Sequence, residues 1–180
     1  MNKKGDIWIS AALYTAIGII LIGLVLSVGM PFINKVKMRN TMLQTKEVMY
    51  NMDNVIREVW NEGLGSRRPI FVEIQEGDFL IDEINDKISW SVISEDKLGI
   101  EPNIEIHEGN LVIKSDQLGQ GYNIQLWLDY VDREANPDQV IIDLKTTAGT
   151  KQISGSYNLV IEHADATKCG SGECVLIREA

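Results

Sequence analysis

The feature that most constrains this chain is an uninterrupted run without formal charge, from Ile7 to Ile33. A secretory signal carries an apolar core of only about 7–15 residues before its cleavage site. A helix over Ile7–Ile33 would rise about 40 Å, which is enough to cross the hydrocarbon of a bilayer with some tilt. The run is rich in alanine, leucine and isoleucine and exceeds any plausible strand, so it predicts a membrane-spanning helix.

Small residues and one proline interrupt the bulky side chains of this span. The candidates for helix assembly or bending are Gly18, Gly23, Ser27 and Pro31. Gly23 and Ser27 stand four residues apart, a spacing that lets two helix backbones approach closely, although small residues also occur in membrane spans by chance. Pro31 removes one backbone donor and is expected to bend or loosen the helix near Ser27.

The helical pattern continues beyond the span as an amphipathic segment over residues 34–62. Its apolar positions fall at helical intervals and form one stripe: Met42, Met49, Met52, Ile56 and Val59. Gly63 then supplies a C-terminal stop, so the sequence predicts one long helix over residues 6–63, of which 6–33 is apolar. The stripe needs a cover, which either the chain's own C-terminal domain or a neighbouring subunit can provide.

From Pro69 onward the hydrophobic period changes from helical to two, which predicts strands through the rest of the chain. About eight or nine short strands are expected: PIFVEI and FLIDEI flanking a QEGD turn, KISWSVI, a hairpin in IEIHEGNLVIKS at Gly109-Asn110, NIQLWLDYV, VIIDLKTT, YNLVIEHA and VLIREA. The expected fold class is α+β: a long N-terminal helix, then an antiparallel β-sandwich-like domain or an open barrel-like sheet over residues 69–180.

Cys169 and Cys174 are the only two cysteines, and they lie close together in ATKCGSGECVLI. The two glycines between them permit a tight loop, so we expect a disulfide at a hairpin tip, which requires an oxidising compartment. Two reduced thiols are the alternative. A structural zinc site is disfavoured, because it needs four ligands and His163 alone does not complete the set.

Composition and motifs argue against catalysis and against nucleic acid as a partner. The net charge is −9, and the chain has no extended run rich in lysine and arginine. No nucleophile motif or phosphate-binding loop is present, and His107 and His163 are expected at the surface. Trp90, Trp127 and Tyr130 are expected in the core or on a sheet face. We therefore expect no enzyme, no cofactor and no metal site.

The N-terminal residues resemble the class III signal peptide of type IV pilin-like proteins. Lys3-Lys4-Gly5 is followed by Asp6 and an uninterrupted apolar helix, and the match is closest to archaeal pilins, whose leaders often read KKG. In that family a prepilin peptidase cuts on the cytoplasmic side just after the glycine, and the apolar helix is retained. The resemblance implies a leader of residues 1–5, a mature N-terminus at Asp6, and filaments whose core is a bundle of these helices.

The resemblance covers residues 1–62 in motif and the rest of the chain in architecture. Many bacterial pilins carry glutamate at the fifth mature position, where it pairs with a neighbouring terminal amine. Counted from Asp6, that position holds Ser10, so this pairing is not carried over.

Together with the long helix and the β domain, this resemblance implies a structural subunit of a surface filament for adhesion or a related task. Its expected partners are further copies through the N-terminal helices, the membrane before assembly, and prepilin peptidase with the pilus assembly machinery. The alternative is an uncleaved single-pass membrane protein whose extracellular β domain binds a ligand or partner as a monomer. Lys3 and Lys4 favour a cytoplasmic N-terminus, whereas Lys35, Lys37 and Arg39 favour the opposite orientation. The expected disulfide favours an extracellular β domain.

Overall fold

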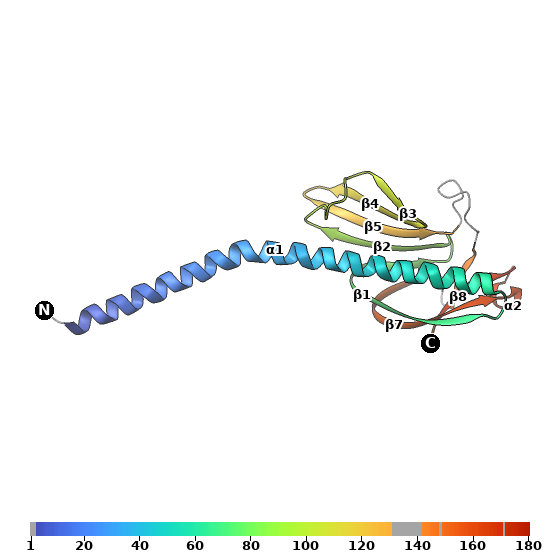
Figure 1. Cartoon of the computed structure of the whole chain (residues 1–180), viewed down its shortest axis with the longest axis horizontal. Helices are drawn as coiled ribbons and strands as arrows, with labels where there is room; N and C mark the ends of the chain where they lie inside the picture. The colour runs from blue at the N-terminus through green and yellow to red at the C-terminus, as the bar shows by residue number, and fades with distance from the viewer. Residues whose placement is uncertain (1–2, 131–141, 148, 171) are drawn as a thin grey trace. The chain divides into compact units, whose positions relative to one another are not determined.

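The computed structural model describes residues 3–130, 142–147, 149–170 and 172–180; of the first nine residues it describes only the side chain of Trp8 (Figure 1). The chain divides into two compact units, Met1–Arg39 and Asn40–Ala180.

The first helix, α1, runs from Lys3 to Glu62 and contributes to both units. Pro31 lies inside the helix, and helical structure continues through it. The predicted stop is confirmed, because α1 ends at Glu62 and Gly63 follows with a φ of 94°. That region of backbone conformation favours glycine and is typical of the residue just after a helix.

Besides residues 40–62 of α1, the described residues of the second unit form eight strands and one short helix. In chain order these are β1 (Arg67–Asp82), β2 (Lys87–Ser94), β3 (Glu105–Glu108), β4 (Leu111–Leu118), β5 (Gly121–Asp129), β6 (Leu144–Thr146), β7 (Lys151–Ala164), α2 (Ala166–Cys169) and β8 (Cys174–Glu179). The strands form one sheet in the order β3-β4-β5-β2-β1-β7-β8-β6. All neighbouring strands are antiparallel except β6 and β8, which are parallel. The α+β class is confirmed, with one curled sheet as its β part.

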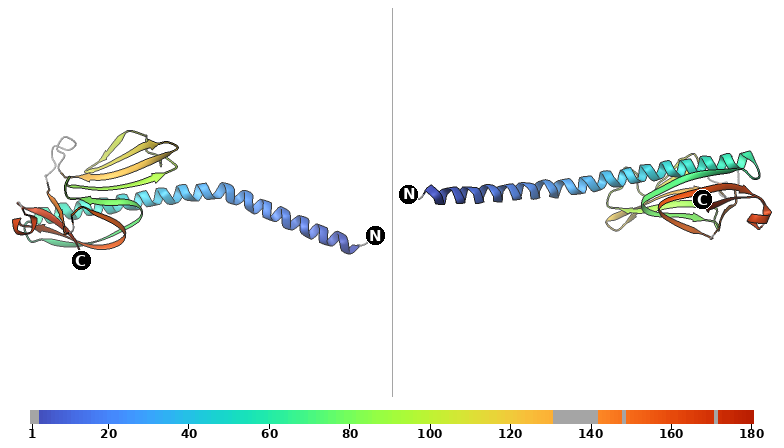
Figure 2. Two further views of the ribbon diagram at one scale, coloured as in Figure 1. Left: turned by 180° about the vertical axis from the view of Figure 1, so that it is seen from behind. Right: turned by 90° about the horizontal axis from the view of Figure 1, so that it is seen from below.

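Residues 40–62 of α1 lie along one side of this sheet, between the β2–β5 strands and the β1–β7–β8 strands (Figures 1 and 2). Four residues of the predicted stripe, Met49, Met52, Ile56 and Val59, have no exposed surface, and Met42 is 8% exposed. Burying a side chain of this size stabilises the fold by about 1.5–3 kcal/mol. The stripe is therefore covered by the chain's own domain, as the first of the two alternatives predicted.

The sheet contributes its own alternating rows to the same core. The core-facing residues of β2 and β5 are Ile88, Trp90, Val92, Ile124, Leu126 and Leu128, and each is less than a tenth exposed. The alternation predicted for KISWSVI and NIQLWLDYV is confirmed. The hairpin predicted at Gly109-Asn110 is also confirmed, since β3 and β4 flank these two residues and pair antiparallel.

The QEGD stretch was wrongly predicted as a turn, because it lies inside the single long strand β1. Ile74 pairs with Gly155 of β7, and Phe79 pairs with Ile153, so QEGD stands opposite one residue of the neighbouring strand as a bulge. From Asp78, the last residue of this stretch, β1 gains β2 as a second neighbour. The bulge thus lets one strand serve two parts of the sheet.

The bulge has a specific contact with the core. The indole Nε1 of Trp90 donates a hydrogen bond to the carbonyl oxygen of Glu76 across 2.9 Å. Gly77 has a φ of 92°, and a Cβ there would lie 2.5 Å from Trp90 Nε1. Only glycine fits this position without displacing the indole.

Two further strands differ from their predicted limits. β7 begins at Lys151, six residues before the predicted YNLVIEHA segment. The VIIDLKTT segment forms the three-residue strand β6 only, and its first two residues, 140 and 141, lie outside the described residues.

Candidate functional site

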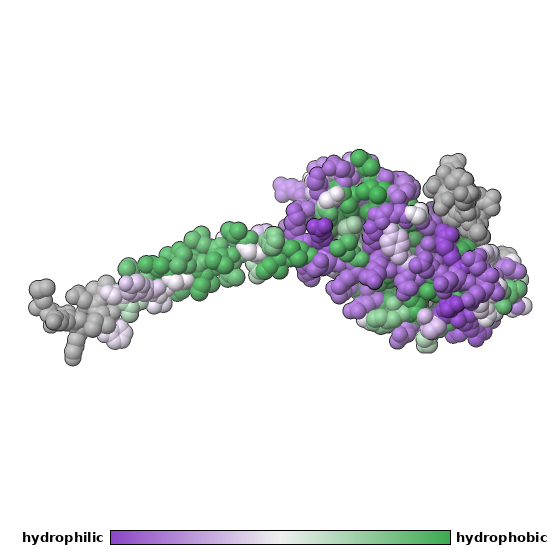
Figure 3. Space-filling model, viewed as in Figure 1, coloured by the Kyte–Doolittle hydropathy of each residue, from purple (hydrophilic) through white to green (hydrophobic). Residues whose placement is uncertain are grey.

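The apolar segment of α1 presents large hydrophobic side chains to its surroundings. No described side chain from Trp8 to Ile33 is buried, and the visible face of this segment is largely hydrophobic (Figure 3). An 18-residue window of the helix reaches a mean hydropathy of 2.5, so by length and composition it can cross a membrane. An apolar surface of this extent is costly in water, at about 25 cal/mol per Å², and requires cover by lipid or protein.

Two hydroxyl groups within this segment are satisfied by the helix itself. Thr15 Oγ1 donates to the carbonyl oxygen of Ala11 across 2.8 Å, and Ser27 Oγ donates to that of Leu24 across 2.9 Å. An apolar environment offers such groups few partners. These two side chains are therefore compatible with lipid or with tightly packed helices.

The glycines of this segment are not required by the fold of the chain. A Cβ added at Gly18, Gly23 or Gly29 would meet nothing within 4 Å, and none of the three has a positive φ. The small surface of Gly23 and Ser27, about one helical turn apart, is thus available to another helix.

The predicted processing site lies at the first residues of α1. The structure describes Lys3, Lys4, Gly5 and Asp6 by their backbone only, as part of the helix. Their side chains lie outside the described residues, and cleavage after Gly5 stays a prediction from the sequence.

A buried polar cluster joins residues 40–62 of α1 to the sheet. Asp53 Oδ1 accepts hydrogen bonds from the Tyr130 hydroxyl and from Asn110 Nδ2, each across 3.0 Å. Its other oxygen accepts one from Arg57 Nε across 2.9 Å. Burial, and then the neighbouring carboxylate, raises the pKa of Tyr130 well above its ordinary value. This cluster was not predicted from the sequence, although Asp53 follows Met52 of the buried stripe.

A second polar link connects the same helix to the β3–β4 hairpin. Glu108 accepts hydrogen bonds from Lys46 Nζ across 2.7 Å and from the Tyr50 hydroxyl across 2.5 Å. These bonds lower the pKa of Glu108. Burial and the same carboxylate raise the pKa of Tyr50 to about 12. The hydroxyl thus stays protonated as a donor over the whole physiological range.

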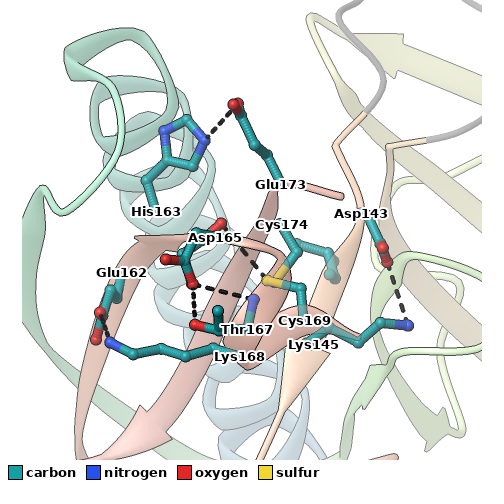
Figure 4. Close-up of a disulfide and its surroundings, with 12 residues drawn as sticks. Asp143, Lys145, Glu162, His163, Asp165, Thr167, Lys168, Cys169, Glu173 and Cys174 are labelled. Atoms are coloured by element: carbon teal, nitrogen blue, oxygen red, sulfur yellow. Dashed lines mark hydrogen bonds and ion pairs between the residues drawn. A yellow bond between two sulfur atoms is a disulfide. The ribbon is translucent and has the colours of Figure 1, made fainter. Parts of the chain in front are cut away.

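The predicted disulfide is confirmed: Cys169 and Cys174 are bonded, with their Cα atoms 5.9 Å apart (Figure 4). It joins the last residue of α2 to the first residue of β8, so a short helix replaces the plain hairpin tip that the sequence predicted. Asp165 begins this helix by accepting a hydrogen bond from the backbone N–H of Thr167 across 3.2 Å. Both sulfur atoms are engaged, which excludes the alternative of two reduced thiols.

His163 is buried, contrary to the prediction that it lies at the surface. It is 4% exposed, and its ring stacks on the indole of Trp60 with the two centroids 4.5 Å apart. Its Nε2 lies 3.3 Å from the Glu173 carboxylate (Figure 4). Its backbone N–H donates to the Ser66 carbonyl across 3.0 Å. His163 therefore ties the end of α1 to β7, whereas His107 is exposed as predicted.

Glu162, the neighbour of His163, is a buried carboxylate surrounded by cations. Arg67 Nη2 lies 3.0 Å from its Oε1, Lys168 bonds the same oxygen, and Arg178 Nε lies 3.8 Å from Oε2. Burial raises the pKa of Glu162, but the combined effect of Lys168 and Arg67 is larger and opposite. The net result is a lowered pKa. The carboxylate is thus held ionised at the junction of β1, β7, α2 and β8.

Within the described part of the chain, no group of three or more histidine, cysteine, aspartate or glutamate side chains is placed to hold a metal ion. Comparisons with protein-family models, with curated proteins and with solved structures find no match for this chain.

Proposed function

We propose that this protein is a structural subunit of a type IV pilus-like surface filament, held in the membrane as a precursor and assembled through its retained apolar helix. One observation carries the proposal. The stripe of residues 40–62 is already covered by the chain's own sheet, whereas no described side chain from Trp8 to Ile33 is buried and the stretch carries no charge. The second unit has its own core without that surface, which therefore serves a contact outside the chain.

The leader-like residues favour a filament over a simple anchor. Lys3-Lys4-Gly5 before Asp6 resembles a prepilin-peptidase site, and cutting after Gly5 would leave the whole apolar helix in place. Moving such a helix from lipid to protein gains little hydrophobic free energy, because lipid tails are as apolar as leucine. Assembly then depends on close packing at small residues such as Gly23 and Ser27, and on work from the assembly machinery.

The second unit fits an extracellular position. Its disulfide persists in oxidising compartments and is rare where thiols are kept reduced. The net charge of the whole chain is −9, and the acidic residues apart from Asp6 all lie in the second unit, which favours solubility of that unit.

The test is co-expression with an active prepilin peptidase, followed by intact-mass measurement and electron microscopy of sheared surface material. We expect the mass to fall by that of residues 1–5 and fibres to appear. In the matched variant Gly5→Val, the mass should stay that of the full chain and fibres should be missing, while the Cys169–Cys174 linkage still forms.

A full-length mass in the presence of active peptidase would support the alternative, an uncleaved membrane-anchored protein that binds a ligand or partner as a monomer. Fibres from Gly5→Val would show that cutting after Gly5 is not the maturation step.

A further inference from the structure

The solvent-facing side of β2 and β5 carries a group of neutral polar side chains around one indole. In these strands the residues between the core-facing ones point away from the core, so that Ser89 pairs with Trp127 and Ser91 with Gln125. We name this surface the β2–β5 face: Ser89, Ser91, Asn123, Gln125 and Trp127. The five residues line an open hollow of about 610 Å³.

Trp127 lies on this face and not in the core. Its cross-strand neighbours are Ser89 on β2 and Val112 on β4. Lys87 Nζ lies 4.6 Å from the centroid of the Trp127 ring. The ring is therefore on the solvent-facing side of the sheet, where the ammonium group of a flexible lysine lies over it.

The polar groups beside the indole have capacity for a ligand. The hydroxyls of Ser89 and Ser91 and the carboxamide of Asn123 make no hydrogen bond with any residue that the structure describes. Gln125 uses Nε2 to bond Asp116 across 3.2 Å, which leaves its carbonyl oxygen. Hydroxyl and carboxamide groups both donate and accept, which matches a ligand whose own groups do the same.

The charges around this face select against an anionic ligand. The chain carries 26 acidic and 17 basic residues, and Asp82 and Asp129 border the hollow with Lys87 as the cation. A polyanion approaching this protein would be repelled by its overall charge. A neutral ligand with many hydroxyl groups meets neither repulsion nor an unpaired charge.

We infer that the β2–β5 face binds a neutral oligosaccharide. The C–H face of a pyranose ring stacks on Trp127, in place of the Lys87 ammonium group, and the sugar hydroxyls bond Ser89, Ser91 and Asn123. An indole flanked by hydroxyl and carboxamide groups offers one apolar surface for stacking and several groups for hydrogen bonds. The inference is independent of the filament proposal, because every residue it uses lies in the second unit.

A purely structural role for Trp127 is the competing explanation. Val112 is 5% exposed on the outer side of the sheet, and Trp127 is its cross-strand neighbour. The indole shields that valine from water, so loss of stability in Trp127→Ala would not by itself show a ligand. Asn123→Ala separates the two roles, because the Asn123 carboxamide makes no hydrogen bond with any described residue and its cross-strand neighbours, Ile93 and Asp116, are not core residues.

The experiment uses the full chain in a phosphocholine detergent, since alkyl glycosides would compete for the site. The probes are hexasaccharides of glucose, mannose, galactose and N-acetylglucosamine, measured by saturation-transfer NMR and calorimetry. We expect saturable binding of at least one hexasaccharide with a Kd of roughly 0.1–1 mM. Asn123→Ala should weaken it several-fold and Trp127→Ala about tenfold or more.

The control is Tyr157→Ala. Tyr157 also carries a lysine over its ring, with Lys151 Nζ 5.2 Å from the ring centroid, but it lies on β7 and outside the β2–β5 face. It should leave binding unchanged. Absence of saturable binding up to roughly 10 mM for all four hexasaccharides would overturn the inference. Unchanged affinity in both Asn123→Ala and Trp127→Ala would also overturn the inference. So would salt-sensitive binding of the polyanion heparin with no binding of the neutral hexasaccharides.

Discussion

The Tyr130 hydroxyl donates a hydrogen bond to the Asp53 carboxylate across 3.0 Å, with Tyr130 fully buried and Asp53 only 9% exposed. This contact joins the end of β5 to the amphipathic part of α1. A hydrophobic stripe alone permits a helix to slide or rotate on a sheet, whereas directional bonds to one carboxylate define one position. The contact therefore fixes which turn of the helix meets which strand.

Replacing Asp53 should be among the most destabilising changes in the second unit. Asp53→Ala leaves the Tyr130 hydroxyl, the Asn110 amide and the Arg57 guanidinium without this acceptor, and should lower the free energy of unfolding by about 3 kcal/mol. Tyr130→Phe removes one donor only and should cost about 1 kcal/mol. Urea unfolding measures both. The exposed neighbour Asn54→Ala is the control, and a change in Asp53→Ala as small as in this control would contradict the assigned role.

The two glycines of the β1–β7 region test the bulge. Gly77→Ala forces a Cβ to within 2.5 Å of Trp90 Nε1 in addition to a φ of 92°, and should cost about 3 kcal/mol. Gly155→Ala has a similar φ of 90° but meets nothing within 4 Å, so it should cost about 1 kcal/mol. Thermal or urea unfolding of the two variants isolates the steric contribution. Equal losses would mean that the indole moves away freely.

The disulfide closes a short loop, so its expected contribution is modest. Replacing Cys169 and Cys174 together by serine should lower the free energy of unfolding by about 2 kcal/mol in the chain-entropy model. Peptide mapping without reductant should recover the two cysteines in one linked peptide from surface material. Free thiols in that material would show that the domain matures in a reducing environment.

The lowered pKa of Glu108 predicts that the stability of the second unit depends on pH. Its pKa is lowered from 4.5 in the folded state, chiefly by hydrogen bonds from Lys46 and Tyr50, so the unfolded state binds its proton more readily. The stability that it contributes is full above pH 4.5 and is lost as pH falls through the folded-state pKa. Glu108 is partly exposed, so Glu108→Gln should cost only about 0.5 kcal/mol at pH 7.

Unfolding curves of the wild type and Glu108→Gln should therefore converge on acidification below pH 4.5. Glu101→Gln serves as the control, because its exposed pairing with Lys97 at 3.4 Å is a surface contact of little energetic value. A gap between wild type and Glu108→Gln that persists or widens in acid would reverse the sign and contradict the assignment.

Gly23 tests assembly separately from folding. Gly23→Leu should leave the stability of the second unit unchanged, since a Cβ at this position meets nothing within 4 Å. It should reduce filament number about tenfold if neighbouring helices approach at Gly23 and Ser27. Electron microscopy counts the filaments, and Ile22→Leu is the volume-conserving control. Normal filaments from Gly23→Leu would place the helix contact elsewhere.

The parts of the fold that were predictable are those that local sequence determines. The stripe through Met49 and Met52, the helix end at Gly63 and the hairpin at Gly109-Asn110 each depend on residues within one or two turns of each other. Burial and backbone conformation confirm all three. The disulfide belongs to the same group, because only Cys174 was available to Cys169.

The parts that were not predictable depend on distant partners. QEGD carries the same glycine–aspartate signal whether it forms a turn or a bulge, and pairing of Ile74 with Gly155 decides between them. His163 lies next to the end of β7, where exposure is common, and it is buried because Trp60 from α1 stacks on it. Nothing near Asp53 in the sequence reveals Tyr130 and Asn110 as its partners.

The central place of β1 in the sheet has a consequence for when the domain can fold. Arg67 to Ile74 pair with β7, which begins only at Lys151, and with no other strand among those described. A growing polypeptide therefore carries the first half of β1 without its neighbour until β7 has left the ribosome. The sheet cannot close before β7 has left the ribosome, so any pause or premature stop upstream of Lys151 leaves an open hydrogen-bonding edge that invites aggregation.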